Sequence, residues 1–188
     1  MSILTNTPSM NKLSTGKVAL SIILTSESVF FATMLVAYIS LRNQENWPVE
    51  HTLARLLIPL ANTAILLISS ISAWRGTVSI RDGKSSASQA WQLVTLLLGL
   101  VFVTVQIYEF SRAGMHINDQ AFGGVFFTLM GFHGLHVLAG VVFLIINLAR
   151  TRLGDFSPTR YDAVELGTLF WYYVTFVWIV LFAALYLL

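Results

Sequence analysis

The stretch that decides the fold runs from Gly124 to Ala149 and reads GVFFTLMGFHGLHVLAGVVFLIINLA. It contains no acidic residue, lysine or arginine, and a hydrocarbon core of about 30 Å needs only about 20 such residues in a helix. His133 and His136 lie near its middle. A charged side chain at that depth costs about 3 kcal/mol, so ionisable groups there normally face a partner or a functional cavity. The two histidines therefore mark the region to examine first.

The composition extends this reading to the whole chain of 188 residues. Hydrophobic residues make up 56% and charged residues 11%, with a mean hydropathy of +0.74. Such a chain has too little polar surface for a soluble globule, so we expect an all-α integral membrane bundle. The net charge of +2 comes without a basic stripe, and we expect no nucleic-acid partner. The absence of cysteine excludes disulfides and thiolate-held metal centres.

The hydropathy pattern predicts one domain of five transmembrane helices. Residues 1–16 form a polar N-terminal tail, and residues 17–188 form the membrane domain. The predicted spans are about 17–41, 53–75, 91–111, 124–149 and 165–188. The connections carry turn-forming residues, among them the sequence Arg81-Asp82-Gly83-Lys84 with the serines that follow it.

The distribution of basic residues predicts the orientation. Eight lysines and arginines fall on the side of the N-terminus and three on the other. Because cytoplasmic loops hold an excess of these residues, we expect a cytoplasmic N-terminus and a C-terminus outside. The localisation predicted is a bacterial plasma membrane, crossed several times.

Small and polar residues recur every three or four positions in the spans and predict the faces that pack against protein. In the third span the stripe is Gln92, Thr95, Gly99, Phe102, Gln106 and Glu109. In the fifth span it is Glu165, Thr168, Tyr172, Thr175, Ile179, Phe182 and Tyr186. In the fourth span, Gly131 and Gly134 lie opposite the histidines and would permit close approach of a neighbour, so we expect this helix to be sandwiched.

Glu27 is the predicted partner of the histidines. It lies about 15 Å into the first span, and His133 lies about 14 Å into the antiparallel fourth, so they would meet near the midplane. We expect a hydrogen bond between Glu27 and His133 or His136. These three residues form the predicted central polar cluster. We predict neither a metal site nor a catalytic residue, because no third ligand besides Glu27 and no activated nucleophile accompany the histidines.

Two further sets of residues receive structural assignments. The first consists of polar residues expected to join helices: Gln106, Glu109, Asn62 and Glu165. Of these, Gln106 and Glu109 are expected to tie the third helix to the fourth. An alternative for Glu165 is that its negative charge is stabilised by the positive, N-terminal end of its helix dipole. The second set consists of basic residues expected near anionic lipid headgroups: Arg75, Arg81 and Arg150.

Several motifs resemble subunit III of the haem-copper oxidases, in its shorter five-helix bacterial form. They are Ser26-Glu27-Ser28-Val29-Phe30-Phe31, Gln106 with Glu109-Phe110, Gly131-Phe132-His133-Gly134-Leu135-His136-Val137, and Phe156-Ser157-Pro158. The resemblance covers about residues 17–188. The chain departs from it in the last helix, where Tyr172 and Thr175 stand in place of the family's usual His and Asp.

The resemblance implies a subunit of cytochrome c oxidase that itself carries no haem or copper. Its partner would be the haem- and copper-bearing subunit I, possibly with subunit II, small subunits or a supercomplex. It would bind structural phospholipids and support proton uptake, stability and oxygen access in aerobic respiration. The alternatives are subunit III of a quinol oxidase or of a nitric-oxide-reductase complex. A small transporter is a weaker alternative, because no inverted repeat or broken helix pair is evident.

Overall fold

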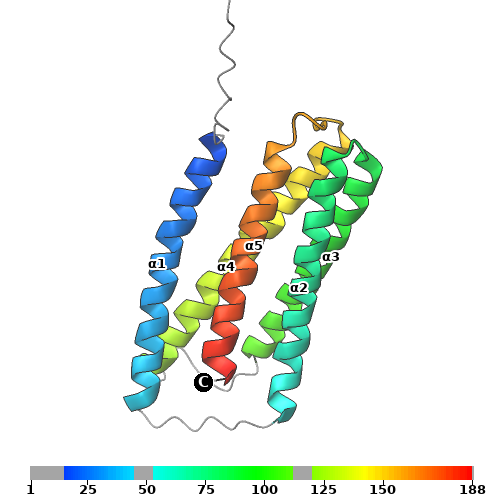
Figure 1. The fold of residues 1–188 in the computed structure, drawn as a ribbon. Helices are drawn as coiled ribbons and strands as arrows, with labels where there is room; N and C mark the ends of the chain where they lie inside the picture. The colour runs from blue at the N-terminus through cyan, green and yellow to red at the C-terminus, as the bar shows by residue number, and fades with distance from the viewer. Residues whose placement is uncertain (1–14, 45–52, 112–119, 188) are drawn as a thin grey trace, which may run out of the picture.

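The structure is a bundle of long helices (Figure 1). The computed structural model describes residues 15–44, 53–111 and 120–187. Its elements are α1 (Thr15–Gln44), α2 (Leu53–Arg81), α3 (Ser85–Ser111), α4 (Gln120–Arg152), α5 (Asp162–Phe182) and a π-helical turn η1 (Ala183–Leu187). Five helices are long and apolar enough to cross a membrane. The chain is therefore an all-α, multi-pass membrane protein, as predicted.

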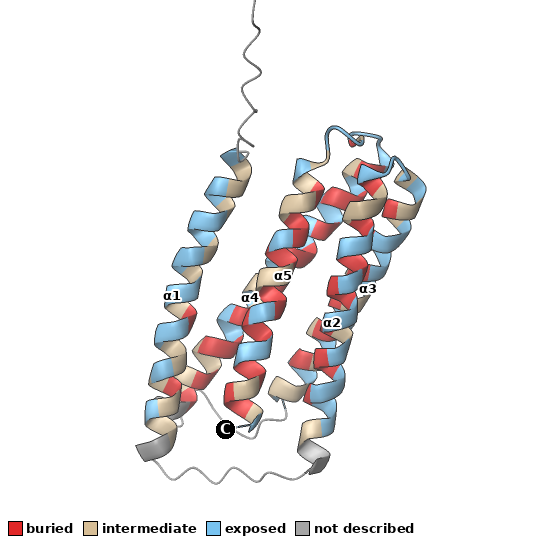
Figure 2. Ribbon diagram, viewed as in Figure 1, coloured by how far each residue is buried: buried red, intermediate tan, exposed pale blue. Residues whose placement is uncertain are grey.

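The helices α4 and α5 join the other three. In Figure 1, α1 lies on one side, the antiparallel pair α2 and α3 on the other, and α4 and α5 between them. The helix α5 packs on α2, α4 and α1, while α4 packs on α3, α5 and α1. The predicted sandwiching of α4 is therefore present, but α5 is the more enclosed helix: 56% of its apolar window is buried, against 39% in α4 (Figure 2).

Two tight turns close one end of the bundle, which we call the hairpin end. Gly83, with φ of 77°, ends α2, and the backbone N–H of Lys84 donates to the carbonyl of Ser79 at 2.9 Å. Gly154, with φ of 79°, ends α4 in the same way. This left-handed glycine cap satisfies the last carbonyls of a helix. The other end of the bundle is called the opposite end below.

The second and third predicted spans were too short at this end. Span two was placed to end at residue 75 and span three to begin at 91, whereas α2 continues to Arg81 and α3 begins at Ser85. The serines assigned to a connection form the first turn of α3, where the Ser88 hydroxyl donates to the carbonyl of Gly76 at 2.8 Å. Hydropathy marks only the apolar part of a helix, while hydrogen bonding continues beyond it.

The buried indole of Trp171 occupies the centre of the bundle, where two glycines make room for it. A Cβ atom built on Gly99 would lie 2.7 Å from the Trp171 ring, and one built on Gly140 would lie 2.8 Å from it. The expectation of close packing at Gly131 and Gly134 was wrong, because a Cβ at either position meets nothing within 4 Å. At Gly99 and Gly140, the close approach makes room for a large ring.

The predicted seam of α3 is present, and that of α5 is present in part. The buried positions of α3 are Ser88, Gln92, Thr95, Gly99, Phe102 and Gln106. In α5, Thr168, Thr175 and Phe182 of the predicted stripe are buried, but Ile179 is 40% exposed, while Trp171 and Trp178 are completely buried. The two indole N–H groups donate to hydroxyls of α2, so this side of α5 also faces the core.

Candidate functional site

His136 of α4 pairs with Glu27 of α1. Its Nε2 atom lies 3.3 Å from Oε2 of Glu27, with the two side chains 16% and 35% exposed. Its Nδ1 atom lies 2.7 Å from the carbonyl oxygen of Phe132, one turn earlier. Because a carbonyl only accepts, Nδ1 carries a hydrogen and Nε2 is the atom that faces the carboxyl group. Glu27 and His136 can therefore share one proton, held on either the carboxyl or Nε2.

The Glu27–His136 pair lies deep in the membrane domain. Glu27 is 12 residues after the start of the 30-residue helix α1, or about 18 Å along a helix of about 45 Å. His136 is 16 residues after the start of the 33-residue helix α4, or about 24 Å along about 50 Å. The pair thus occupies the middle of both helices. Placing an unpaired carboxyl group there would cost free energy, because it would have no hydrogen-bond partner. The imidazole of His136 provides that partner.

His133 has a different environment from His136. Its ring is completely buried and stacks on Trp178 at a centroid distance of 5.3 Å. The rings of Phe102 and Phe31 meet it edge-on at 6.4 and 6.5 Å. Neither ring nitrogen has a hydrogen-bond partner among the described residues. His133 is therefore packed as an aromatic side chain, and of the two predicted alternatives the contact to Glu27 is made by His136.

Hydroxyl and indole groups join α2 to α5 along their length. The four pairs, at 2.8 to 2.9 Å, are Thr77–Thr168, Ser69–Trp171, Ser70–Thr175 and Thr63–Trp178. Thr175, which stands in place of the family's usual Asp, is thus one member of this series. Tyr172, in place of the usual His, is half-buried. The sequence predicted that Thr175 faces protein but did not identify Ser70 as its partner. The axial register of two helices cannot be read from the sequence of either helix alone.

Two of the four predicted helix-joining residues do join helices. The Asn62 side-chain amide donates to the carbonyl of Phe102 at 3.2 Å and links α2 to α3. The Lys17 ammonium lies 2.8 Å from Oε1 of Glu165 and links α1 to α5 at the hairpin end. Glu165 therefore has a cationic partner in addition to its position in the first turn of α5.

The predicted tie between α3 and α4 through Gln106 and Glu109 is not formed within the described part of the chain. The Oε2 atom of Glu109 is buried without a hydrogen-bond partner. Gln106 is 93% buried and lines a groove whose α4 side is apolar, with Met130 and Leu138 among its walls. The spacing in α3 was right, but the facing surface of α4 offers no acceptor there.

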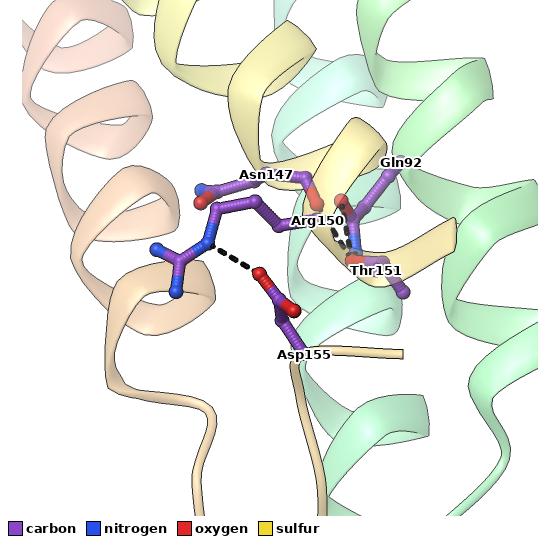
Figure 3. A network of polar contacts seen from close by, with 5 residues as sticks. All are labelled: Gln92, Asn147, Arg150, Thr151 and Asp155. Atoms are coloured by element: carbon purple, nitrogen blue, oxygen red, sulfur yellow. Dashed lines mark hydrogen bonds and ion pairs between the residues drawn. The ribbon is translucent and has the colours of Figure 1, made fainter. Parts of the chain in front are cut away.

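The polar link between α3 and α4 lies instead at the hairpin end (Figure 3). The Gln92 amide donates to the hydroxyl of Thr151 at 3.0 Å, and that hydroxyl donates to the carbonyl of Asn147 at 2.7 Å. The Asn147 amide in turn donates to the carbonyl of Ala163 in α5 at 3.0 Å. This network fixes three helix ends relative to one another.

The three basic residues predicted near lipid headgroups differ in the contacts that they make with other side chains. Nε of Arg150 lies 3.1 Å from Oδ2 of Asp155 in a half-exposed ion pair (Figure 3). The guanidinium of Arg75 lies 5.3 Å from the ring centroid of Trp74. Arg81 is exposed at the end of α2. All three lie toward the hairpin end, where lipid headgroups would be.

Comparison with protein families decides what kind of protein carries this pair. The family model described as cytochrome c oxidase subunit III matches residues 7–188. The chain belongs to the cytochrome c oxidase subunit III family. Membership in this family makes it a subunit of a multisubunit oxidoreductase complex of the respiratory chain.

Curated relatives agree with the subunit III assignment. Cytochrome c oxidase subunit 3 of Thermostichus vulcanus is 34% identical over 90% of this chain and 85% of the relative. The probable cytochrome c oxidase subunit 3 of Nocardia farcinica is 36% identical over 95% of this chain and 90% of the relative. Cytochrome c oxidase subunit 3 of Heterololigo bleekeri is 34% identical over 93% of this chain and 71% of the relative.

His133 and His136 are not placed to hold a haem between them. Two histidines that ligate a haem from both faces lie on opposite sides of its ring. His133 and His136 lie three residues apart on one helix; the first is enclosed by aromatic rings, and both nitrogens of the second have partners. Among residues 15–44, 53–111 and 120–187, no three His, Asp or Glu side chains are placed to hold a metal ion.

Proposed function

We propose that this chain is the non-catalytic subunit III of a haem-copper cytochrome c oxidase in a bacterial plasma membrane. The observation that supports this most is the Glu27–His136 pair, a proton-sharing group at mid-depth that holds α1 against α4. Placing two ionisable side chains at this depth costs free energy, so such residues usually have a function. A pair that can exchange a proton suits a subunit that supports proton movement in a neighbouring protein.

The proposed contributions to the catalytic subunit are proton uptake, stability and oxygen access. The Glu27 side chain is 35% exposed, so a proton could exchange between the pair and groups beside this face of α1. The polar series between α2 and α5 and the network at the hairpin end would give a rigid support. Bound phospholipids would complete the surface, with Arg75, Arg81 and Arg150 each gaining about 1 kcal/mol near anionic headgroups.

The redox chemistry would be performed by the partner subunits. Haem and copper would be held by subunit I, which would lie beside this chain, with subunit II, small subunits or a supercomplex as further partners. Electrons would come from cytochrome c, and the N-terminus and the hairpin end would face the cytoplasm.

The test is purification through an affinity tag on this chain in a mild detergent. We expect a larger haem-bearing polypeptide to co-purify, a reduced-minus-oxidised spectrum of haem, and oxygen consumption driven by reduced cytochrome c. Oxygen consumption driven only by quinol, or reduction of nitric oxide, would replace the proposed donor or reaction. Purification without any haem protein would contradict the proposal.

A further inference from the structure

The hydroxyl group of Tyr173 in α5 is a buried polar group without a hydrogen bond in the described part of the chain. The Tyr173 side chain packs against the core of the bundle and is half-buried as a whole. Buried hydroxyl groups in native structures normally have a partner, because losing contact with water costs free energy that only a new hydrogen bond offsets. The groups around this hydroxyl therefore indicate its role.

Tyr173 lies at the depth of Glu27. The helices α1 and α5 both begin at the hairpin end and pack on each other (Figure 1). There the Lys17 ammonium of α1 lies 2.8 Å from Oε1 of Glu165 in α5, which fixes the axial register of the two helices. Glu27 follows Lys17 by ten residues, or about 15 Å, and Tyr173 follows Glu165 by eight residues, or about 12 Å. Glu27 and Tyr173 are therefore level to within one helical turn.

Two aromatic residues of α5 face the Glu27–His136 pair. The ring of Phe170 stacks on the imidazole of His136 at a centroid distance of 6.5 Å. Tyr173 follows Phe170 by three residues, so both side chains lie on the same side of α5. The Tyr173 hydroxyl interacts electrostatically with the Ser28 hydroxyl and the Glu27 carboxyl group, both of α1. The pair is thus part of a site that α1, α4 and α5 share.

The Ser28 hydroxyl limits how the Tyr173 hydroxyl can bond. Ser28 donates its own proton to the carbonyl of Leu24, one turn earlier, at 2.7 Å. Its oxygen is left to accept a hydrogen bond. The Tyr173 O–H group therefore has two acceptors beside it, the Ser28 oxygen and the Glu27 carboxyl group.

The charge of Glu27 decides between these two acceptors. With the shared proton on Glu27, the carboxyl group is a neutral acceptor, as the Ser28 oxygen is. With the proton on Nε2 of His136, the carboxylate is ionised, and hydrogen bonds to an ionised acceptor are roughly twice as strong as those between neutral groups. A hydrogen bond to the charged form stabilises that form. The Tyr173 hydroxyl therefore favours the state in which Glu27 is ionised and His136 is protonated.

No other charged side chain in the described parts of these three helices lies at this depth. Apart from the pair, the charged residues of α1, α4 and α5 lie toward the helix ends: Lys17, Arg42, Arg150, Arg152, Asp162 and Glu165. His133 is enclosed by aromatic rings. The hydroxyl of Tyr173 is thus the polar group of α5 that can act on the pair.

We propose that Tyr173 positions the shared proton of the Glu27–His136 pair: its hydroxyl donates to the Glu27 carboxylate and so holds the proton on Nε2 of His136. When the proton moves from Nε2 to the carboxylate, both groups become neutral and the Tyr173 O–H turns to the Ser28 oxygen. This inference deepens the proposed function, because it names the group that sets where the proton resides, and it rests on that function for its role in proton uptake.

The experiment measures the protonation of Glu27 by infrared spectroscopy of the intact complex, purified through a tag on this chain. A protonated carboxyl group has a C=O stretching band that a carboxylate lacks, and the part that disappears in Glu27→Gln belongs to Glu27. Tyr173→Phe removes the hydroxyl and keeps the ring. Tyr172→Phe is the matched control, because it removes a hydroxyl from the adjacent half-buried position, on which Glu27 does not act.

We expect the band of protonated Glu27 to increase by roughly twofold or more in Tyr173→Phe, because the ionised state loses a charge-assisted hydrogen bond. The band should be unchanged in Tyr172→Phe. In Ser28→Ala it should be equal or smaller, because the Tyr173 proton then has only Glu27 as acceptor. An unchanged band in Tyr173→Phe, an equal increase in Tyr172→Phe, or an increase in Ser28→Ala would overturn the proposal.

The haem spectrum of each preparation tests the proposed function separately, since the band can be measured whichever partner co-purifies. A preparation without haem in which Tyr173→Phe still increases the band would contradict the proposed function and support the role of Tyr173. A haem-bearing complex in which Tyr173→Phe leaves the band unchanged would do the reverse.

Discussion

The Nε2 atom of His136 lies 3.3 Å from Oε2 of Glu27, so a carboxyl group and an imidazole can share a proton at the contact between α1 and α4. Of the two histidines in α4, only His136 reaches Glu27, because His133 is enclosed by Trp178 and phenylalanine rings.

The variant Glu27→Gln tests whether the shared proton matters for turnover. Glutamine has nearly the same shape and can still donate to Nε2 of His136, so we expect the oxidase complex to assemble with normal haem content. Without an exchangeable proton, proton uptake should slow, and the number of turnovers before inactivation should fall severalfold. Oxygen consumption followed to exhaustion, together with proton release per electron, measures both effects.

A matched control is Glu165→Gln, which removes a paired carboxylate at the hairpin end of the bundle. Its partner Lys17 and Glu165 itself are each 31% exposed, and ion pairs of this exposure contribute at most about 1 kcal/mol. This variant should keep the turnover of the wild type. Equal behaviour of both variants would argue against a specific role of Glu27.

The substitution Gly140→Ala should destabilise the protein. Its Cβ would lie 2.8 Å from the ring of Trp171, which is completely buried and cannot move aside. Overpacking of this kind costs about 1 to 3 kcal/mol. In Gly131→Ala, in the same helix, the added Cβ meets nothing within 4 Å, so this variant should lose no stability. Thermal unfolding of the purified complex compares the two, and equal midpoints would contradict the packing argument.

Ser70 and Thr175 should show a measurable energetic coupling. Their hydroxyls lie 2.8 Å apart between α2 and α5, and both are buried. Interhelical hydrogen bonds in membrane proteins contribute about 0.6 kcal/mol on average and at most about 1.7. A double-mutant cycle of Ser70→Ala and Thr175→Val, followed by unfolding in sodium dodecyl sulfate, should give a coupling within this range. A coupling near zero would show that the pair contributes packing only.

The predicted orientation can be tested with single cysteines, since the chain has none of its own. Asp82→Cys lies in the turn of the hairpin end, and Ser111→Cys lies at the opposite end of the bundle. A membrane-impermeant maleimide should label position 111 in intact cells and position 82 only in inverted vesicles. The reverse pattern would place the N-terminus outside.

The sequence by itself determined the number of spans, the helical class and the buried seam of α3. These properties follow from local causes: the length of apolar segments and the spacing of small and polar residues on one helix. The same spacing held only in part on α5, where Thr168 and Thr175 of the predicted stripe are buried but Ile179 is exposed. Contacts with three helices bury Trp171 and Trp178 as well, which lie outside that stripe.

Only the tertiary structure decided which groups meet. It selected His136 over His133 for Glu27, joined Ser70 to Thr175, left Gln106 facing a groove, and moved the polar link between α3 and α4 to Gln92 and Thr151. These outcomes depend on the rotation and axial offset of each helix against its neighbours. Packing of all five helices sets those two quantities together, so no single segment of the sequence specifies them.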